Sequence, residues 1–267
     1  MFSTRKRSIF RGLLFALLPA ALLAGCVVSN GTDADRAETV PQAAPAAKNV
    51  IIMISDGWGY YDAAAAGIFH NGEAGTLNYE SFPVHFAMST YPAGGGYDGH
   101  AAWGEFDYVK RGATDSAAAG TALATGRKTY NGAIGVVGSP EEPQNVPNIL
   151  EAAEKLGKAT GVVTSVEWSH ATPAAFVAHN QDRDNYEDIA RQMINESAAE
   201  VIMGCGHPLY DRNSLTPPEE PQAHKFVGGG DTWEALAAGT AGGDSDGDGK
   251  ADAWTLVETR EDIRNLA

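Results

Sequence analysis

The 267-residue chain has few cysteines, few basic side chains and no long apolar run. Its two cysteines, Cys26 and Cys205, cannot build the disulfide framework of a small secreted domain. The chain has 19 Lys and Arg residues but 34 Asp and Glu residues. The resulting formal net charge of −15 argues against nucleic acid as a partner. The apolar run at residues 12–24 is shorter than the roughly 20 residues that a membrane-spanning helix needs. What remains is a globular protein with length enough for one large or two modest domains.

The apolar run has the features of an export signal. It follows basic residues between Arg5 and Arg11 and ends in "LLAGC", which is similar to the lipobox of bacterial lipoproteins. On this interpretation residues 1–26 lie outside the fold, Cys26 is lipidated and becomes the mature N-terminus, and residues 27–47 form a flexible tether. The protein would then be exported and anchored to a membrane of the cell envelope, facing the periplasm or the cell surface. A plain secretory signal with an incidental cysteine is the alternative.

From Lys48 onward, apolar runs alternate with amphipathic segments. Short apolar runs predict buried strands, and apolar residues at helical spacing predict helices. This alternation predicts an α/β fold, a three-layer sandwich with a largely parallel central sheet. The expected strands are residues 49–55, 159–165 and 200–204, and the expected helices are residues 147–157 and 185–194.

Side chains that can carry chemistry lie near the ends of these segments. Asp56 directly follows the first expected strand, at the edge of a parallel sheet where ligands bind. Ser116 begins a run of small residues that predicts a helix ending at Gly126. A helix N-terminus attracts a phosphate or an oxyanion, and a serine there is a nucleophile once a base or a metal activates it. The simpler alternative is that Asp115 or Ser116 only caps the helix.

Three segments resemble the alkaline phosphatase family, in the order in which that family has them. They are "IIMISDGWG" (residues 51–59), "TDSAAAGTALATGRKTYNGAIGV" (114–136) and "HATPAAFVAHNQDR" (170–183). The resemblance covers the chain from about residue 48 to its end. It implies an enzyme of broad specificity that hydrolyses phosphomonoesters and releases inorganic phosphate. Its site would hold two Zn²⁺ ions and one Mg²⁺ ion.

The resemblance also implies roles for particular residues. Asp56 would bridge the second zinc and the magnesium, and Ser116 would be the catalytic nucleophile and a ligand of the second zinc. Thr172 would bind magnesium through its hydroxyl. Arg183 would be a catalytic and substrate-binding residue, because its planar fork can bind two phosphate oxygens. His170 stands where some members have Asp and others His. It would lie near the magnesium, bound through water, or be an ordinary histidine.

These residue types suit the implied chemistry. A phosphomonoester dianion must be neutralised before a nucleophile can approach it. Two zinc ions would stabilise the attacking and leaving oxygens of an in-line displacement. Ser116 would attack phosphorus and form a phosphoserine intermediate, which water would then hydrolyse.

Two features depart from the family pattern. Trp58 stands where many relatives have Met, which we interpret as packing or a rim contact. The second departure concerns the zinc ligands, which the family takes from its C-terminal half as a D-x-x-x-H pair, an Asp-His dipeptide and a further His. None of the seven histidines here lies four residues after an Asp or directly follows one. We therefore expect the N-terminal portion of an alkaline phosphatase, incomplete at its C-terminus and inactive alone. The seven are His70, His85, His100, His170, His179, His207 and His224.

The segment "DSDGDGKAD" has the carboxylate spacing of an EF-hand-like calcium loop. Gly249 stands at the turn, but Thr255 replaces the usual bidentate Glu at the twelfth position. An acidic, solvated surface turn in an insertion is the equal alternative. The candidate Ca²⁺ ligands, at positions 1, 3, 5 and 9 of the loop, are Asp244, Asp246, Asp248 and Asp252.

Two other functions remain open at this point. Related phosphodiesterases and sulfatases would share the fold, although the C/S-x-P-x-R motif of sulfatases is missing here. A non-catalytic surface lipoprotein that binds only calcium or phosphate is the other. The partners we expect are phosphomonoester substrates and, through the lipid, a membrane; a homodimer is left open.

Overall fold

The computed structural model of the chain describes residues 2–4, 47–197, 199–210, 224–244 and 249–266. The chain divides into two units. The first consists of Met1–Arg7 together with Asp56–Ala267, and the second is Ser8–Ser55. No helix within the described ranges is long and apolar enough to cross a membrane. The elements are, in chain order, β1 (Phe2–Thr4), α1 (Tyr60–Asn71), η1 (Asn78–Ser81), α2 (Gly99–Gly104), η2 (Tyr108–Lys110), α3 (Ser116–Thr125), β2 (Val136–Gly138), β3 (Pro143–Asn145), α4 (Ile149–Lys155), β4 (Gly161–Glu167), α5 (Ala171–Ala174), α6 (Tyr186–Asn195), β5 (Val201–Cys205), η3 (His224–Val227), α7 (Gly230–Ala237), β6 (Thr255–Val257) and α8 (Arg260–Arg264).

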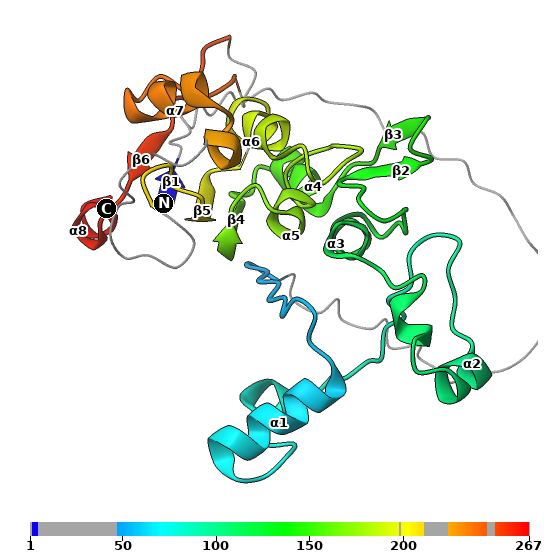
Figure 1. Cartoon of the computed structure of the whole chain (residues 1–267). Helices are drawn as coiled ribbons and strands as arrows, with labels where there is room; N and C mark the ends of the chain where they lie inside the picture. Colours follow the sequence, from blue (N-terminus) through cyan, green and yellow to red (C-terminus); the bar gives the residue numbers. More distant parts are fainter. Residues whose placement is uncertain (1, 5–46, 198, 211–223, 245–248, 267) are drawn as a thin grey trace, which may run out of the picture. The chain divides into compact units, whose positions relative to one another are not determined.

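The strands β4 and β5 form a parallel pair, joined along the chain by α5 and α6 (Figure 1). Val162 pairs with Ile202, and both side chains are buried. On α6 the buried apolar residues include Ile189, Met193 and Ile194, whose spacing places them on one helix face. Both strands and the helix between them agree with the sequence prediction to within about two residues at most ends. The predicted α/β class is confirmed.

The core of this unit gathers large side chains from the sheet, from α6 and from the elements after β5. Trp168 and Trp254 are each only 1% exposed. The indole N–H of Trp254 donates to the carbonyl of Ile194 at 2.7 Å, so this large side chain is buried with its polar atom satisfied. The segment that precedes β6 is thereby fixed against the end of α6.

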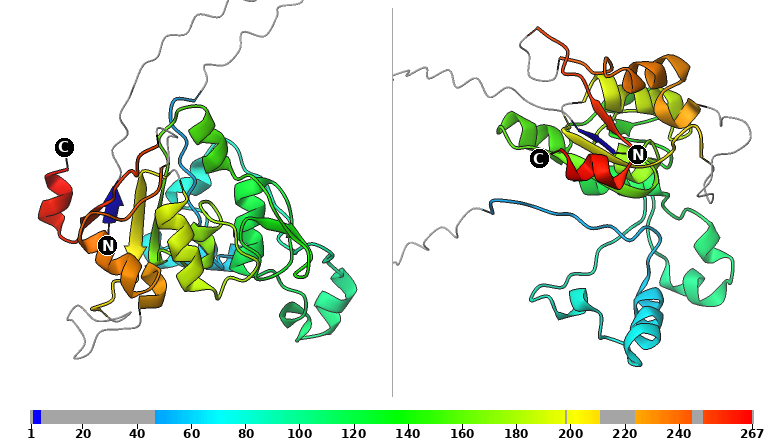
Figure 2. Two further views of the ribbon diagram at one scale, coloured as in Figure 1. Left: turned by 90° about the horizontal axis from the view of Figure 1, so that it is seen from above. Right: turned by 90° about the vertical axis from the view of Figure 1, so that its left-hand side faces the viewer.

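The N-terminus differs from the expectation that residues 1–26 lie outside the fold. The sheet has the order β4-β5-β1-β6, and β1 pairs antiparallel with both of its neighbours (Figure 2). The edges of β5 and β6 carry backbone groups that need partners, and three extended residues satisfy both. The described sheet therefore combines one parallel pair with two antiparallel pairs, where the sequence predicted a largely parallel sheet. The remainder of the predicted signal peptide and tether, with Cys26, lies outside the described residues.

The predicted buried strand at residues 49–55 is wrong. The described residues 47–55 form no strand, and the side chains of Ile51 and Met53 are 84% and 91% exposed. An apolar run becomes a strand only where neighbouring backbone completes its hydrogen bonds, and the run makes no such pairing within the described part of the chain. The strand β4, expected to be buried, is buried only in part, because Val163 is 70% exposed.

Candidate active site

Ser116 is the first residue of α3, as the run of small residues predicted. Asp115 is the N-cap, and its Oδ1 accepts a hydrogen bond from the backbone N–H of Ala118 at 2.9 Å. Gly126 ends the helix with a φ of 72°, a left-handed conformation that suits glycine. The local sequence therefore places the Ser116 hydroxyl at the positive end of a ten-residue helix.

The small residues of α3 allow a close approach to α5 (Figure 1). A Cβ added at Gly120 would lie 3.1 Å from the Cβ of Ala175 and 3.5 Å from the Cα of Thr172. Larger side chains would therefore push the two helices apart. This packing sets the separation between Ser116 and Thr172.

Asp56 brings these two hydroxyl groups to one carboxylate. The Ser116 hydroxyl donates to Asp56 Oδ1 at 3.0 Å, and the Thr172 hydroxyl donates to Asp56 Oδ2 at 2.9 Å. The three residues are far apart in the chain, and the structure gathers them as the family resemblance implied. Gly57, which follows Asp56, has a φ of 70° and turns the chain away from the site.

Arg183 lies at the same end of α3, paired with Asp115. Its Nη1 donates to Asp115 Oδ2 at 3.0 Å, and the two side chains are only 21% and 24% exposed. The backbone N–H of Gly132 donates to the same oxygen at 3.1 Å, while the carbonyl of Gly132 accepts from the N–H of Arg183 at 2.8 Å. The sequence predicts Asp115 only as a cap. The structure shows that it caps the helix with one oxygen and holds Arg183 with the other.

His170 is the N-cap residue of α5, two positions before Thr172. Its ring stacks on Tyr186 with 6.0 Å between centroids and 27° between ring planes. Its proximity to a magnesium ion stays a prediction. Tyr186, which begins α6, was not identified from the sequence, where it reads only as a helical residue.

The chemistry of the gathered donors suits a hard cation. Asp56, Ser116 and Thr172 supply one carboxylate and two hydroxyl groups, and Mg²⁺ prefers such oxygen ligands. A catalytic zinc usually has about three protein ligands, commonly with histidine among them. Within the described residues, no group of three or more His, Cys, Asp or Glu side chains could hold a metal ion. These residues fit the magnesium side of the expected centre and do not provide a zinc ligand set.

The candidate calcium loop is described only at its ends. The backbone N–H of Gly249 donates to Asp244 Oδ2 at 2.9 Å, which closes the turn. The N–H of Asp252 donates to the carbonyl of Gly243 at 2.9 Å. Asp246 and Asp248 lie outside the described residues, so calcium binding stays a prediction.

Known proteins resemble this chain over most of its length. The model of the alkaline phosphatase family matches residues 47–265. Alkaline phosphatase 4 of Bacillus subtilis (strain 168) is 34% identical over 241 residues, which cover 84% of this chain and 48% of that relative. The alkaline phosphatase of Escherichia coli (strain K12) is 41% identical over 143 residues, 52% of this chain and 27% of that relative.

Among solved structures, the alkaline phosphatase of the Antarctic bacterium TAB5 is 34% identical, with a TM-score of 0.43, over 58% of this chain and 38% of that one. The chain spans about half the length, or less, of the curated relatives named above. The family model nevertheless matches most of its residues. The chain belongs to the alkaline phosphatase family.

Proposed function

We propose that this chain belongs to an enzyme that hydrolyses phosphomonoesters through a phosphoserine intermediate on Ser116, with two zinc ions and one magnesium ion as cofactors. One observation carries the proposal: Ser116 lies hydrogen-bonded to Asp56 at the start of α3, where Asp115 also holds Arg183. The proposed nucleophile and the proposed phosphate-binding guanidinium therefore lie at the N-terminus of the same helix. Membership of the family favours this hydrolase over the phosphodiesterase, sulfatase and non-catalytic alternatives.

Ser116 has the placement that a nucleophile on phosphorus needs. Its hydroxyl proton faces Asp56, so the oxygen lone pairs are free for the incoming phosphoryl group. The partial positive charge of the α3 N-terminus stabilises negative charge on that oxygen. In the first step the Ser116 Oγ–P bond forms, the ester P–O bond breaks, and the alcohol leaves with a proton. Water then attacks phosphorus and returns Ser116 with inorganic phosphate.

Arg183 neutralises part of the charge on the substrate. The bond from Nη1 to Asp115 fixes the plane of the guanidinium, and its other nitrogens remain available to phosphate oxygens. Because the pair is mostly buried, the guanidinium is ordered before the substrate arrives. Lys at this position would keep the charge and lose the planar, two-point contact.

Asp56 and Thr172 are the residues that would hold magnesium, with His170 nearby through water. The metals would supply positive charge that lowers the cost of ionising Ser116 and of bringing in a dianion. The zinc ions need imidazole ligands that the described residues do not gather. The contributions of Ser116 and Arg183 therefore rest on their own contacts within the structure.

A labelling experiment tests the nucleophile. The full-length enzyme is incubated with radiolabelled phosphomonoester, quenched in acid and digested, and the labelled peptide is mapped. We expect phosphoserine at Ser116 and no label in Ser116→Ala, whereas the control Ser139→Ala should label like the wild type. Phosphoserine at another position would overturn the assignment.

Export and anchoring are a separate proposal, motivated by the lipobox. Lipid on Cys26 would hold the enzyme at a membrane of the cell envelope, where phosphate esters outside the cytoplasm would be its substrates. Residues 27–47 would separate the catalytic part from that membrane, and cleavage before Cys26 would remove β1 from between β5 and β6 in the mature protein.

A further inference from the structure

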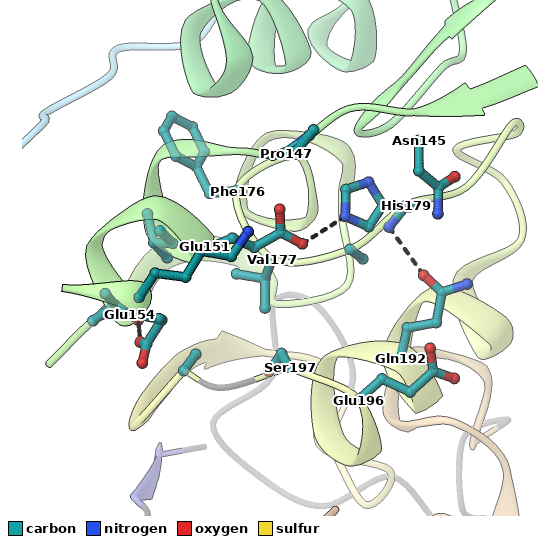
Figure 3. Close-up of a pocket in the computed structure, with 15 residues that line it drawn as sticks. Asn145, Pro147, Glu151, Glu154, Phe176, Val177, His179, Gln192, Glu196 and Ser197 are labelled. Carbon is teal, nitrogen blue, oxygen red and sulfur yellow. Dashed lines mark hydrogen bonds and ion pairs between the residues drawn. The ribbon is translucent and has the colours of Figure 1, made fainter. Parts of the chain in front are cut away.

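His179 lies beside a cavity of about 760 Å³ lined by residues of α4 and α6 (Figure 3). The cavity wall also includes Glu151 of α4 and Gln192 and Glu196 at the other side. The backbone N–H of His179 donates to Gln192 Oε1 at 3.0 Å, and its side chain is 18% exposed. Nothing in the proposed chemistry above uses this histidine, which lies four residues before Arg183.

Both ring nitrogens of His179 face oxygen atoms that accept hydrogen bonds. Nδ1 lies 2.7 Å from the carbonyl oxygen of Gly135, and Nε2 lies 2.8 Å from Glu151 Oε1. A carbonyl has no proton to donate, and neither has an ionised carboxylate. Against a carbonyl and an ionised carboxylate, a bare ring nitrogen at this distance would place two lone pairs against each other, so the geometry favours a proton on each nitrogen. The other charged groups of the cavity wall are Glu154 and Lys155 on α4 and Glu196 after α6.

The two contacts of His179, to Gly135 and to Glu151, form a bridge. On the Gly135 side, this bridge connects to Arg183 through backbone hydrogen bonds. Next to Gly135, Ile134 and Asn180 exchange two backbone hydrogen bonds of 2.8 Å, which tie the segment after α3 to the segment that carries Arg183. Gly132, at the start of the same stretch, accepts from the Arg183 N–H and donates to Asp115 Oδ2. The stretch 132–135 therefore contacts both members of the Asp115–Arg183 pair.

The approach at Gly135 is too close for any other residue. Its φ is 60°, and an added Cβ would lie 2.4 Å from the carbonyl oxygen of Ala178 and 2.7 Å from His179 Nδ1. On the other side of the bridge, Glu151 is fixed because its Oε2 accepts from the N–H of Asn148 at 3.0 Å in the capping box of α4. His179 thus links the capped start of α4 to the backbone at Gly135, where the close approach leaves no room for displacement.

We infer that His179, protonated on both nitrogens and held between Glu151 and Gly135, is a positioning residue for Arg183. The bridge fixes the stretch 132–135, and that stretch fixes the Arg183 backbone and the Asp115 carboxylate together. The inference rests on the proposed function, because it assigns His179 to the binding of phosphate. His179 itself touches neither substrate nor metal.

Steady-state kinetics of the full-length enzyme test the inference. In His179→Gln both N–H donors sit on one nitrogen, so the amide cannot replace two ring nitrogens that face Gly135 and Glu151 from different positions. The loss of a charged hydrogen bond should raise KM and the inhibition constant of inorganic phosphate about tenfold. The fall in kcat should be smaller. Glu151→Gln keeps the capping box but turns an N–H2 donor toward His179 Nε2 in place of the carboxylate, so the charged hydrogen bond is lost and the variant should act in the same direction. The double variant should be no worse than the stronger single variant, because both changes break one bridge. Glu196→Gln removes an equal charge from the same cavity without touching His179, and should behave as the wild type.

Nitrogen-15 NMR of the histidine rings gives a measurement that does not depend on turnover. We expect both ring nitrogens of His179 in the wild type to have the chemical shift of protonated imidazolium. A bare ring nitrogen, or unchanged phosphate inhibition in folded Glu151→Gln and His179→Gln, would overturn the inference. If Ser116 labelling fails while the NMR result holds and phosphate binding still weakens in both variants, the proposed function fails and the bridge stands as a phosphate-positioning device.

Discussion

Asp115 and Arg183 form an ion pair of 3.0 Å at the start of α3, directly beside Ser116. One carboxylate therefore has two partners, because Oδ1 caps the helix and Oδ2 holds the guanidinium. The two oxygens allow the two roles to be separated by substitution.

Asp115→Asn should keep the cap, since Asn caps helices as well as Asp does, and should remove the ion pair, because an uncharged N–H2 donor replaces the oxygen that accepts from Arg183. Asp115→Ala should lose both, and should lower the free energy of unfolding by about 1 kcal/mol more than Asn does. Both variants should bind phosphate more weakly than the wild type. Denaturant unfolding and phosphate inhibition measure the two effects. Equal stability of the Ala and Asn variants would contradict the capping role.

Arg183→Lys keeps the positive charge and removes the planar fork. We expect phosphate to bind about tenfold more weakly, because the two-point contact becomes a single one. The inhibition constant of phosphate, measured on the full-length enzyme with metals present, checks this. Arg191→Lys is a matched control, since Arg191 makes exposed ion pairs with Glu187 and Asp188 on α6. A variant at position 183 with wild-type affinity would show that charge alone suffices.

Local signals in the sequence predicted several elements correctly. Asn148 caps α4, and Gly157, with a φ of 69°, follows its end, as the predicted helix over residues 147–157 requires. Gly126 ends α3 for the same reason. These features depend on residues within one or two helical turns, so the chain itself carries them.

The site was predictable only through resemblance. Asp56 meets Ser116 and Thr172 across 60 and 116 residues, and no spacing rule links them. The second role of Asp115 was missed because its partner lies 68 residues away. The strand expected at residues 49–55 failed for a related reason, since a strand depends on the backbone beside it and not on its own apolar pattern.

Tyr130 should make the protein sensitive to strongly alkaline solution. Burial raises the pKa of its phenol, and the carboxylates of Glu141 and Asp182 raise it further. The unfolded phenol ionises near pH 10, so the stabilisation is complete below that pH and is lost as the pH rises through the folded pKa.

Tyr130→Phe tests this dependence. The hydroxyl makes only a 3.4 Å hydrogen bond to the carbonyl of Gln181, so at pH 8 the variant should match the wild type within about 0.5 kcal/mol. Above pH 10 the wild type should lose stability faster than the variant. Thermal unfolding midpoints between pH 8 and pH 11 measure the difference. Parallel curves for the two proteins would be evidence against any contribution from Tyr130.

Cys26 should carry lipid if the lipobox is used. Metabolic labelling with a fatty-acid analogue should mark the wild type and leave Cys26→Ala unmarked. The other cysteine, Cys205, is exposed and provides the control, because Cys205→Ala should still be labelled. Equal labelling of the wild type and Cys26→Ala would leave simple secretion as the explanation.

The 267-residue chain expressed alone should be inactive and prone to aggregation. Large apolar side chains between residues 50 and 109 are open to solvent, among them Phe86, Trp103 and Phe106, each more than 90% exposed. Exposed apolar surface of this kind promotes association. The described residues also gather oxygen ligands without a histidine set for zinc, so Ser116 keeps its proton and Arg183 alone faces the dianion. We expect p-nitrophenyl phosphate hydrolysis at the rate of a buffer control, and light scattering that grows with protein concentration. Zinc-dependent turnover by the purified chain, lost in Ser116→Ala, would show that its own residues complete the metal centre.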